Sequence, residues 1–101
     1  MGAGGDDTPL MIAVRRGQLE ALRLLLGRGA AVDTLEPTDG CTAFHYACLC
    51  NQAECAEALV RAGCDVGIKD TKGRTGREMA EAEGHAAVVA RLRAVVAEQL
   101  R

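Results

Sequence analysis

One short motif recurs along this chain of 101 residues at a nearly constant interval, and the interval limits the fold more than any other feature. Thr8, Thr42 and Thr75 open similar segments and lie about 33 to 34 residues apart. Nine residues after each threonine comes a residue that readily takes the left-handed conformation that ends a helix. These residues are Gly17, Asn51 and Gly84. A period of this size is typical of proteins built from stacked structural repeats.

Within each unit the apolar residues recur with the period of an α-helix. Those that follow Gly17 and Asn51 fall on one side of a helix. They are Leu19, Leu22, Leu25 and Leu26 in the first unit, and Ala53, Ala56, Leu59 and Val60 in the second. We therefore expect two short helices per unit, with extended turns at 30–40 and 64–73. Because one helix pair cannot bury its own stripe, the units are expected to stack into a solenoid that forms a single domain.

The second unit is the most informative stretch. Segment 39–47 reads Asp-Gly-Cys-Thr-Ala-Phe-His-Tyr-Ala, and segment 63–75 supplies a matching turn without a gap. In both, the chain resembles the ankyrin repeat family, whose first helix begins with a Thr-Pro-Leu-His motif. Met11 and Glu78 stand where the motif has histidine, Gly76 stands where it has proline, and the first turn has one extra residue near Pro37.

The resemblance implies an all-α, ankyrin-repeat solenoid of three stacked helix-turn-helix units joined by β-hairpin-like turns. The ankyrin repeat domain is expected at 8–101, with repeats at about 8–40, 41–73 and 74–101. A flexible, glycine-rich segment is expected at 1–7.

Composition and charge exclude several classes of function. Twelve basic and 14 acidic residues leave a net charge of -2, so nucleic acid is not expected as a partner. The longest apolar runs are far shorter than the roughly 20 residues that span a bilayer, so no membrane association is expected. No secretory signal begins the chain, and five cysteines without one indicate an intracellular, cytoplasmic or nuclear protein.

The chain has two clusters of reactive side chains, and neither predicts catalysis or a metal site. His45 lies three residues before Cys48, on the same helix face, but a buried thiol lacks the exposed, electropositive setting of a nucleophile. The cysteines also lack the paired spacing of a zinc site. We predict no enzymatic activity, metal or cofactor. Three cysteines are predicted to be buried and two to lie at the surface as candidates for oxidation: Cys48, Cys55 and Cys64, against Cys41 and Cys50.

The two ends of the array differ in polarity. Arg91 and Arg93 occupy positions that are apolar in the first two repeats, so this face is predicted to meet water and the last repeat to act as a cap. The first repeat has no such polar residues. Because soluble monomers rarely expose a contiguous apolar patch, we expect either a fragment of a longer protein or an end that packs on something. A monomer or weak self-association through the first repeat is expected.

The ankyrin resemblance also implies a protein-binding role. In that family partners bind in a concave groove formed by the turn tips and the first helices. The matching turn positions are Asp7, Thr38, Asp39, Cys41, Thr71, Lys72 and Arg74. The matching helix positions are Arg15, Arg16, Leu49, Cys50, Ala82 and Glu83.

Two functional hypotheses follow from these positions. Apolar Leu49 and Cys50 between charged neighbours predict a non-enzymatic interaction module that binds a protein or peptide with an apolar anchor and an acidic flank. It is expected to be part of a larger signalling or scaffold protein. The alternative is a structural spacer or assembly element that docks through its uncapped first repeat.

Overall fold

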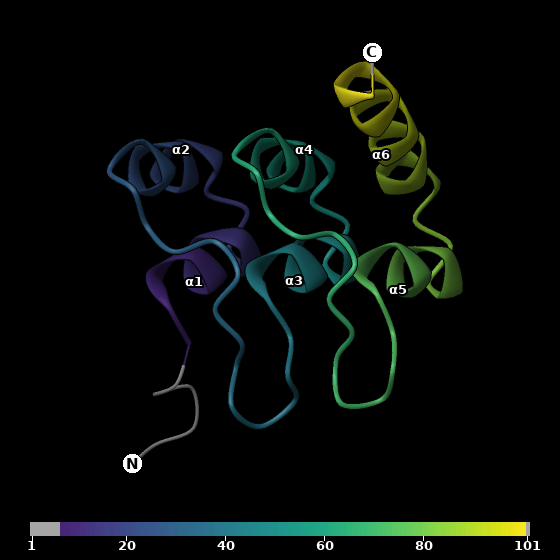
Figure 1. Ribbon diagram of the computed structural model, residues 1–101, viewed down its shortest axis with the longest axis horizontal. Helices are drawn as coiled ribbons and strands as arrows, with labels where there is room; N and C mark the ends of the chain where they lie inside the picture. Colours follow the sequence, from purple (N-terminus) through teal and green to yellow (C-terminus); the bar gives the residue numbers. More distant parts are fainter. Residues whose placement is uncertain (1–6, 101) are drawn as a thin grey trace.

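The fold is an array of three helix pairs. The computed structural model describes residues 7–100, which extend over 43 × 31 × 19 Å; residues 1–6 of the expected flexible segment lie outside them. The helices are α1 (Pro9–Arg15), α2 (Leu19–Gly27), α3 (Ala43–Leu49), α4 (Ala53–Arg61), α5 (Gly76–Ala82) and α6 (Ala86–Gln99). Figure 1 shows α1, α3 and α5 in one layer, α2, α4 and α6 in another, and two hairpin turns that project from the first layer. No strand occurs between residues 7 and 100, and the predicted all-α solenoid of three units is confirmed.

Each first helix begins at the threonine that the motif supplies. The side-chain oxygens of Thr8, Thr42 and Thr75 each accept a hydrogen bond from the backbone N–H three residues further on, at 3.2 Å. An N-cap of this kind typically contributes about 1 kcal/mol to stability. In the third repeat Glu78 also accepts a hydrogen bond from the Thr75 N–H at 2.9 Å, which completes a capping box.

Two residues after the end of each first helix comes a residue with positive φ, as the sequence predicts. The φ angles are 65° at Gly17, 59° at Asn51 and 73° at Gly84. Asparagine tolerates this left-handed region better than most residues with a Cβ atom, so it replaces glycine in the middle repeat. These tight turns fold each second helix back against the first.

A carboxylate closes each hairpin turn from within. Asp70 Oδ1 accepts hydrogen bonds from the backbone N–H groups two and four residues further on, at 3.0 and 2.9 Å. In the first hairpin Glu36 Oε1 accepts them from the N–H groups two and three residues further on, at 2.7 and 2.8 Å. The longer side chain thus serves the turn that has the extra residue near Pro37. A hydrogen bond of 3.0 Å from the Thr71 N–H to the Asp39 carbonyl joins the two hairpins.

The hydrophobic core runs between the two layers and is less complete in the first repeat. Of the four leucines in the predicted stripe of α2, only Leu22 is fully buried, and the other three are half-buried. In α4 every residue of the equivalent stripe except Ala53 is buried. The difference arises because α4 has a helix on both sides, α2 and α6, whereas among the described residues α2 has only α4 beside it in its layer. Leu24, next to this stripe, is 57% exposed.

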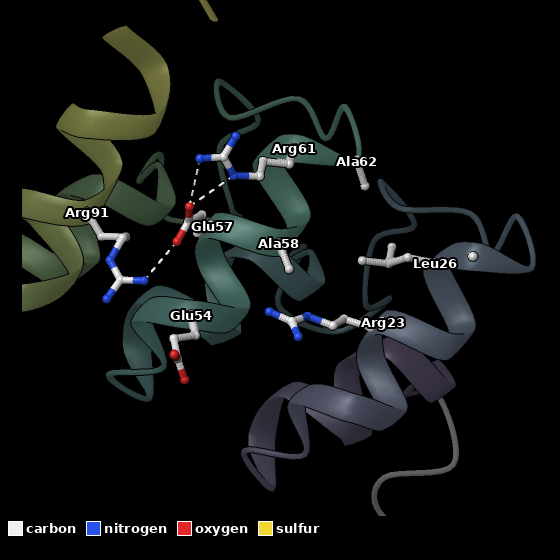
Figure 2. A pocket seen from close by; sticks show the side chains of 9 residues that line it. Arg23, Leu26, Glu54, Glu57, Ala58, Arg61, Ala62 and Arg91 are labelled. Carbon is white, nitrogen blue, oxygen red and sulfur yellow. Dashed lines mark hydrogen bonds and ion pairs between the residues drawn. The ribbon is translucent and has the colours of Figure 1, made fainter. Parts of the chain in front are cut away.

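Ion pairs hold α6 against α4. Arg91 of α6 donates to Glu57 at 2.8 Å, and Arg61 lies 2.9 Å from Glu57 and 2.7 Å from Glu98; Figure 2 shows Glu57 between the two arginines. Hydrogen bonds from Arg91 and Arg61 hold the pKa of Glu57 below its ordinary value. Arg91, which the sequence predicts to face water, keeps 41% of its side chain exposed but also reaches across to α4, where it pairs with Glu57. Arg93 is exposed, as predicted.

The glycine that replaces the motif proline lies against the largest fully buried side chain. A Cβ atom on Gly76 would lie 2.8 Å from Cδ2 and Cε2 of Phe44 and 3.0 Å from Sγ of Cys48. Both of these side chains are buried. The Phe44 ring therefore occupies the space that a side chain at position 76 would need, which explains the departure from the motif at the start of α5.

Candidate functional site

The residues predicted to contact a partner lie on the hairpins, on the first helices or at the ends of those helices. Figure 1 shows these elements of successive repeats side by side. Most of the predicted residues are exposed: Arg15, Arg16, Thr38, Leu49, Cys50, Thr71, Lys72, Arg74, Ala82 and Glu83. Asp7 and Asp39 are partly buried, and Cys41 is buried.

Arg15 is held in place by contacts from two repeats. Its guanidinium carbon lies 4.1 Å from the centroid of the Tyr46 ring in α3, and its Nη1 donates to the Asp7 carboxylate. A cation–π contact at an exposed site contributes about 0.5 to 1 kcal/mol. The Arg15 guanidinium therefore already has partners within the chain, whereas an arginine without an internal ion pair is free to bind an acidic ligand.

Tyr46, absent from the predicted set, connects Arg15 with the first hairpin. Its hydroxyl donates to Asp39 Oδ2 at 3.0 Å. Burial, together with this carboxylate, raises the pKa of Tyr46. Burial alone would raise the pKa of Asp39 too, but hydrogen bonds from the Cys41 N–H and the Tyr46 hydroxyl outweigh it and lower that pKa. The sequence signal that could have pointed to Tyr46 was its position: it is the only tyrosine in the sequence, and it lies in the repeat that follows the one containing Arg15.

The prediction that Cys41 lies at the surface is wrong. Residues 41–48 are all buried, and the hydrogen bond from the Thr71 N–H to the Asp39 carbonyl brings the second hairpin alongside this segment. Burial, followed by the Asp39 carboxylate, raises the pKa of the Cys41 thiol to about 12. Cys50 is exposed, as predicted, and the three cysteines predicted to be buried are buried.

Arg74 is paired with a carboxylate of its own hairpin. Its Nε and Nη2 atoms donate to Asp70 Oδ2 at 3.2 and 2.9 Å. Burial alone would raise the pKa of Asp70, but hydrogen bonds from Arg74 and from the Lys72 N–H lower it. Asp70 is also absent from the predicted set. The sequence offered a signal for it, since an aspartate at the start of a turn commonly accepts hydrogen bonds from the backbone N–H groups of that turn.

The middle of this surface is apolar. Leu49, the last residue of α3, is 38% exposed, and Cys50 follows it. The Leu49 carbonyl accepts a hydrogen bond from His85 Nε2 at 3.1 Å, which joins the end of α3 to the third repeat. Arg16 and Glu83 take the position of Cys50 in the first and third repeats, and all three are exposed. The apolar centre therefore has a cation on one side and an anion on the other.

His45 joins two repeats and has no hydrogen bond to Cys48. Its Nδ1 accepts from the Thr42 N–H at 3.0 Å, so its Nε2 donates to the Arg74 carbonyl at 2.9 Å. Both ring nitrogens are occupied. Cys48 is fully buried, and burial raises the pKa of its thiol to about 12. Because a nucleophilic cysteine needs access and a lowered pKa, this pair lacks the chemistry of a catalytic Cys–His pair.

Two findings concern the described chain as a whole. Among residues 7–100, no three His, Cys, Asp or Glu side chains gather closely enough to hold a metal ion. None of the helices in the same range has the length and apolar character that crossing a membrane requires.

A cavity of about 440 Å³ lies in the other helical layer, between α2, α4 and α6 (Figure 2). Its lining is largely charged, and the charges of Glu57, Arg61 and Arg91 are paired with one another. The lining residues are Arg23, Leu26, Gly27, Glu54, Glu57, Ala58, Arg61, Ala62 and Arg91. None of them belongs to the predicted partner-binding set.

Comparison with known proteins agrees with the repeat architecture. A family model described as "Ankyrin repeats (3 copies)" matches residues 2–70. The chain belongs to the ankyrin repeat family. The crystal structure of the human ASB11 ankyrin repeat domain is similar to it, with a TM-score of 0.80 and 31% identity over 88% of this chain and 40% of that one. Ankyrin repeat domains are themselves non-catalytic and generally bind proteins.

Two curated relatives share the ankyrin region. The ARF GTPase-activating protein GIT1 of Homo sapiens is 39% identical over 80 residues, which are 79% of this chain and 10% of that protein. Protein phosphatase 1 regulatory subunit 27 of Mus musculus is 32% identical over 81 residues, 79% of this chain and 52% of that protein. This ankyrin chain thus spans from a tenth to half of the length of these relatives.

Proposed function

We propose that this ankyrin chain binds a protein or peptide partner along the concave surface formed by its hairpins and by α1, α3 and α5. The observation that carries the proposal is the row Arg16, Cys50 and Glu83, equivalent positions of three repeats that are all exposed and differ in chemistry. Leu49 adds an apolar contact at the centre. An apolar centre within a charged rim is the arrangement in which a few residues supply most of the binding energy.

The exposed cations favour a partner with an acidic flank. Arg15 and Arg74 already pair with Asp7 and Asp70. Arg16 and the side chain of Lys72 make no ion pair within residues 7–100, so a partner carboxylate meets them without displacing an internal group. Charge-assisted hydrogen bonds to arginine are stronger than neutral ones.

The proposed setting is a larger intracellular signalling or scaffold protein. The relatives that support it include the ARF GTPase-activating protein GIT1, of which the matching region is about a tenth. In such a protein the repeat module contributes binding, and other parts contribute further activities.

The test begins with peptides selected from a random display library on the intact chain. Their affinity is then measured by fluorescence anisotropy for the parent and for a variant that combines Arg16→Ala with Leu49→Ala. We expect at least a tenfold loss of affinity, the size that removal of hot-spot residues produces (about 1.4 kcal/mol or more). Far-ultraviolet circular dichroism should stay unchanged, because both side chains are exposed.

Arg28→Ala is the matched control. Arg28 is an exposed arginine at the end of α2, in the other layer, so its loss removes the same charge away from the proposed surface. Its variant should bind the selected peptides like the parent. Peptides that bind the double variant as tightly as the parent would show that the proposed surface is wrong.

The exposed end of the first repeat supports a second role, as a structural spacer or an assembly element that docks through this end. Ile12 and Leu24 are 39% and 57% exposed. Their equivalents in the second repeat, Tyr46 and Ala58, are buried and half-buried, because the first repeat covers them. A second copy of the chain could cover Ile12 and Leu24 in the same way and bury their apolar surface.

Sedimentation equilibrium over increasing protein concentration tests this second role. We expect a weak dimer that dissociates on Leu24→Glu, because a charge in that contact has no partner. Leu22, the neighbouring stripe residue, is unsuitable since it is fully buried and a charge there would unfold the chain. A monomer at every concentration contradicts the docking role and leaves the groove proposal unaffected.

A further inference from the structure

The last helix continues past the point where the other second helices end. Gly29 and Gly63 follow α2 and α4 with φ angles of 82° and 93°, which only glycine adopts without strain. In the third repeat the equivalent position is Val96. Because valine does not favour this conformation, the chain stays helical, and α6 has 14 residues where α2 and α4 have nine.

This extension places apolar side chains where a further hairpin would otherwise begin. They form one wall of a cavity of about 420 Å³, whose other walls come from the second hairpin, the start of α5 and the Phe44 ring. The lining residues are Phe44, Val66, Thr75, Arg77, Leu92, Arg93, Val96, Ala97 and Leu100. Leu100 is 82% exposed, and Val66 is exposed as well. The cavity therefore opens to solvent with an apolar wall.

The charges in the lining are all positive. Arg77 and Arg93 line the cavity, and no carboxylate does. Arg77 Nε contacts Glu81 at 3.2 Å, with both side chains about half exposed. Arg93 makes no ion pair within the described part of the chain. The nearby acid of α6, Glu98, is already paired with Arg61 at 2.7 Å. An incoming anion thus finds an arginine without a competing carboxylate.

We propose that this cavity is a second docking site, which takes a bulky apolar side chain from an extended peptide segment of a partner protein. An acidic residue next to that side chain pairs with Arg93. The volume lies within the range of about 300 to 1,000 Å³ that is usual for ligand sites, which are mostly apolar with a few oriented polar groups. The lining shares no residue with the predicted partner-binding set, although the second hairpin, α3 and α5 contribute to both surfaces, so each proposal is tested by its own residues.

Titration followed by methyl nuclear magnetic resonance tests the site directly. The probe is a short synthetic peptide with one phenylalanine between two aspartates. We expect chemical-shift changes at the methyl groups of Val66, Leu92, Val96 and Leu100; binding of the same peptide at the concave surface, which takes similar chemistry, would add a separate change at Leu49. Shift changes confined to Leu49, or none at millimolar peptide, overturn the proposal. Shifts at these methyls that depend on protein concentration without peptide would mean that a second copy occupies the cavity, which overturns it too.

Charge reversal tests the chemistry of the ligand. Arg93→Glu should weaken binding of the peptide at least tenfold, because it replaces a charge-assisted hydrogen bond by repulsion. The matched control is Arg28→Glu, another exposed arginine at the other end of the array, which should leave the affinity within twofold. Equal loss in both variants would reduce the effect to long-range attraction and overturn the proposal. Equally tight binding of a peptide with lysines in place of the aspartates would show that the acidic residues are not recognised, which overturns it too. The variant with Arg16→Ala and Leu49→Ala should bind this peptide normally.

Discussion

Gly76→Ala is expected to lower the free energy of unfolding by about 1 to 3 kcal/mol, the usual result of overpacking a core. Glycine-to-alanine changes in helices ordinarily do the opposite and stabilise by about 0.5 to 1 kcal/mol. The sign reverses here because the new Cβ would lie 2.8 Å from two ring atoms of Phe44 and 3.0 Å from Cys48 Sγ. Neither neighbour can move outward, since both are buried. Urea unfolding followed by circular dichroism measures the effect.

Two further variants separate the clash from any general effect of alanine. Gly27→Ala, in α2, places its Cβ in open space and should stabilise the chain by about 0.5 to 1 kcal/mol. Phe44→Leu removes the outer ring atoms, so Gly76→Ala should cost less in that background, with a coupling of about 0.5 to 3 kcal/mol between the two positions. Stabilisation by Gly76→Ala in the parent, or strict additivity with Phe44→Leu, would show that the ring does not require this glycine.

The starts and ends of the first helices were predictable because local chemistry decides them. A threonine hydroxyl at an N-cap acts on backbone N–H groups three residues away, so Thr42 specifies its helix start without help from distant residues. Asn51 likewise ends α3 through its own φ angle. The period of such signals then gives the number of repeats, and with it the solenoid.

Burial and pairing were less predictable because they depend on neighbours far away in the sequence. The repeat pattern predicts Cys41 at the surface, but the second hairpin, some 30 residues later in the sequence, lies beside it and buries it. The contacts of Arg15 with Tyr46, and of Arg91 with Glu57, likewise cross from one repeat to another. A repeat alignment shows which positions are equivalent, but the size and charge of the facing side chain decide what each one does.

The helix α6 shows the same difference between features set by local sequence and features set by contacts between distant residues. Its extra length follows from one local substitution, Val96 at a position that holds glycine in the first two repeats. The cavity beside α6 does not follow from this substitution alone, because its lining also includes Phe44 from the second repeat and Val66 from the second hairpin. The predicted polar cap is therefore only part of the outcome, since the same helix carries Arg93 and an apolar wall.

His45→Ala is expected to lower the free energy of unfolding by about 2 to 4 kcal/mol. The change removes partners of the Thr42 N–H and the Arg74 carbonyl, which the ring bonds at 3.0 and 2.9 Å. A buried polar group left without a partner costs about 1 to 3 kcal/mol, and His45 is almost completely buried. Against a total stability of about 5 to 15 kcal/mol for a domain of this size, the loss is large. Urea unfolding again gives the value.

The repeat itself supplies the control, because Glu78 takes the position of His45 in the third unit. Glu78 is exposed and bonds only the local Thr75 N–H, at 2.9 Å, so Glu78→Ala should cost about 1 kcal/mol or less. Two milder changes divide the effect of the histidine: His45→Asn keeps an acceptor near the Thr42 N–H, whereas His45→Gln keeps a donor near the Arg74 carbonyl. If the hydrogen bond to the Arg74 carbonyl contributes most of the effect, His45→Gln should be more stable than His45→Asn. Equal costs for His45→Ala and Glu78→Ala would mean that His45 acts as a helix cap alone, with its bond to the next repeat contributing nothing.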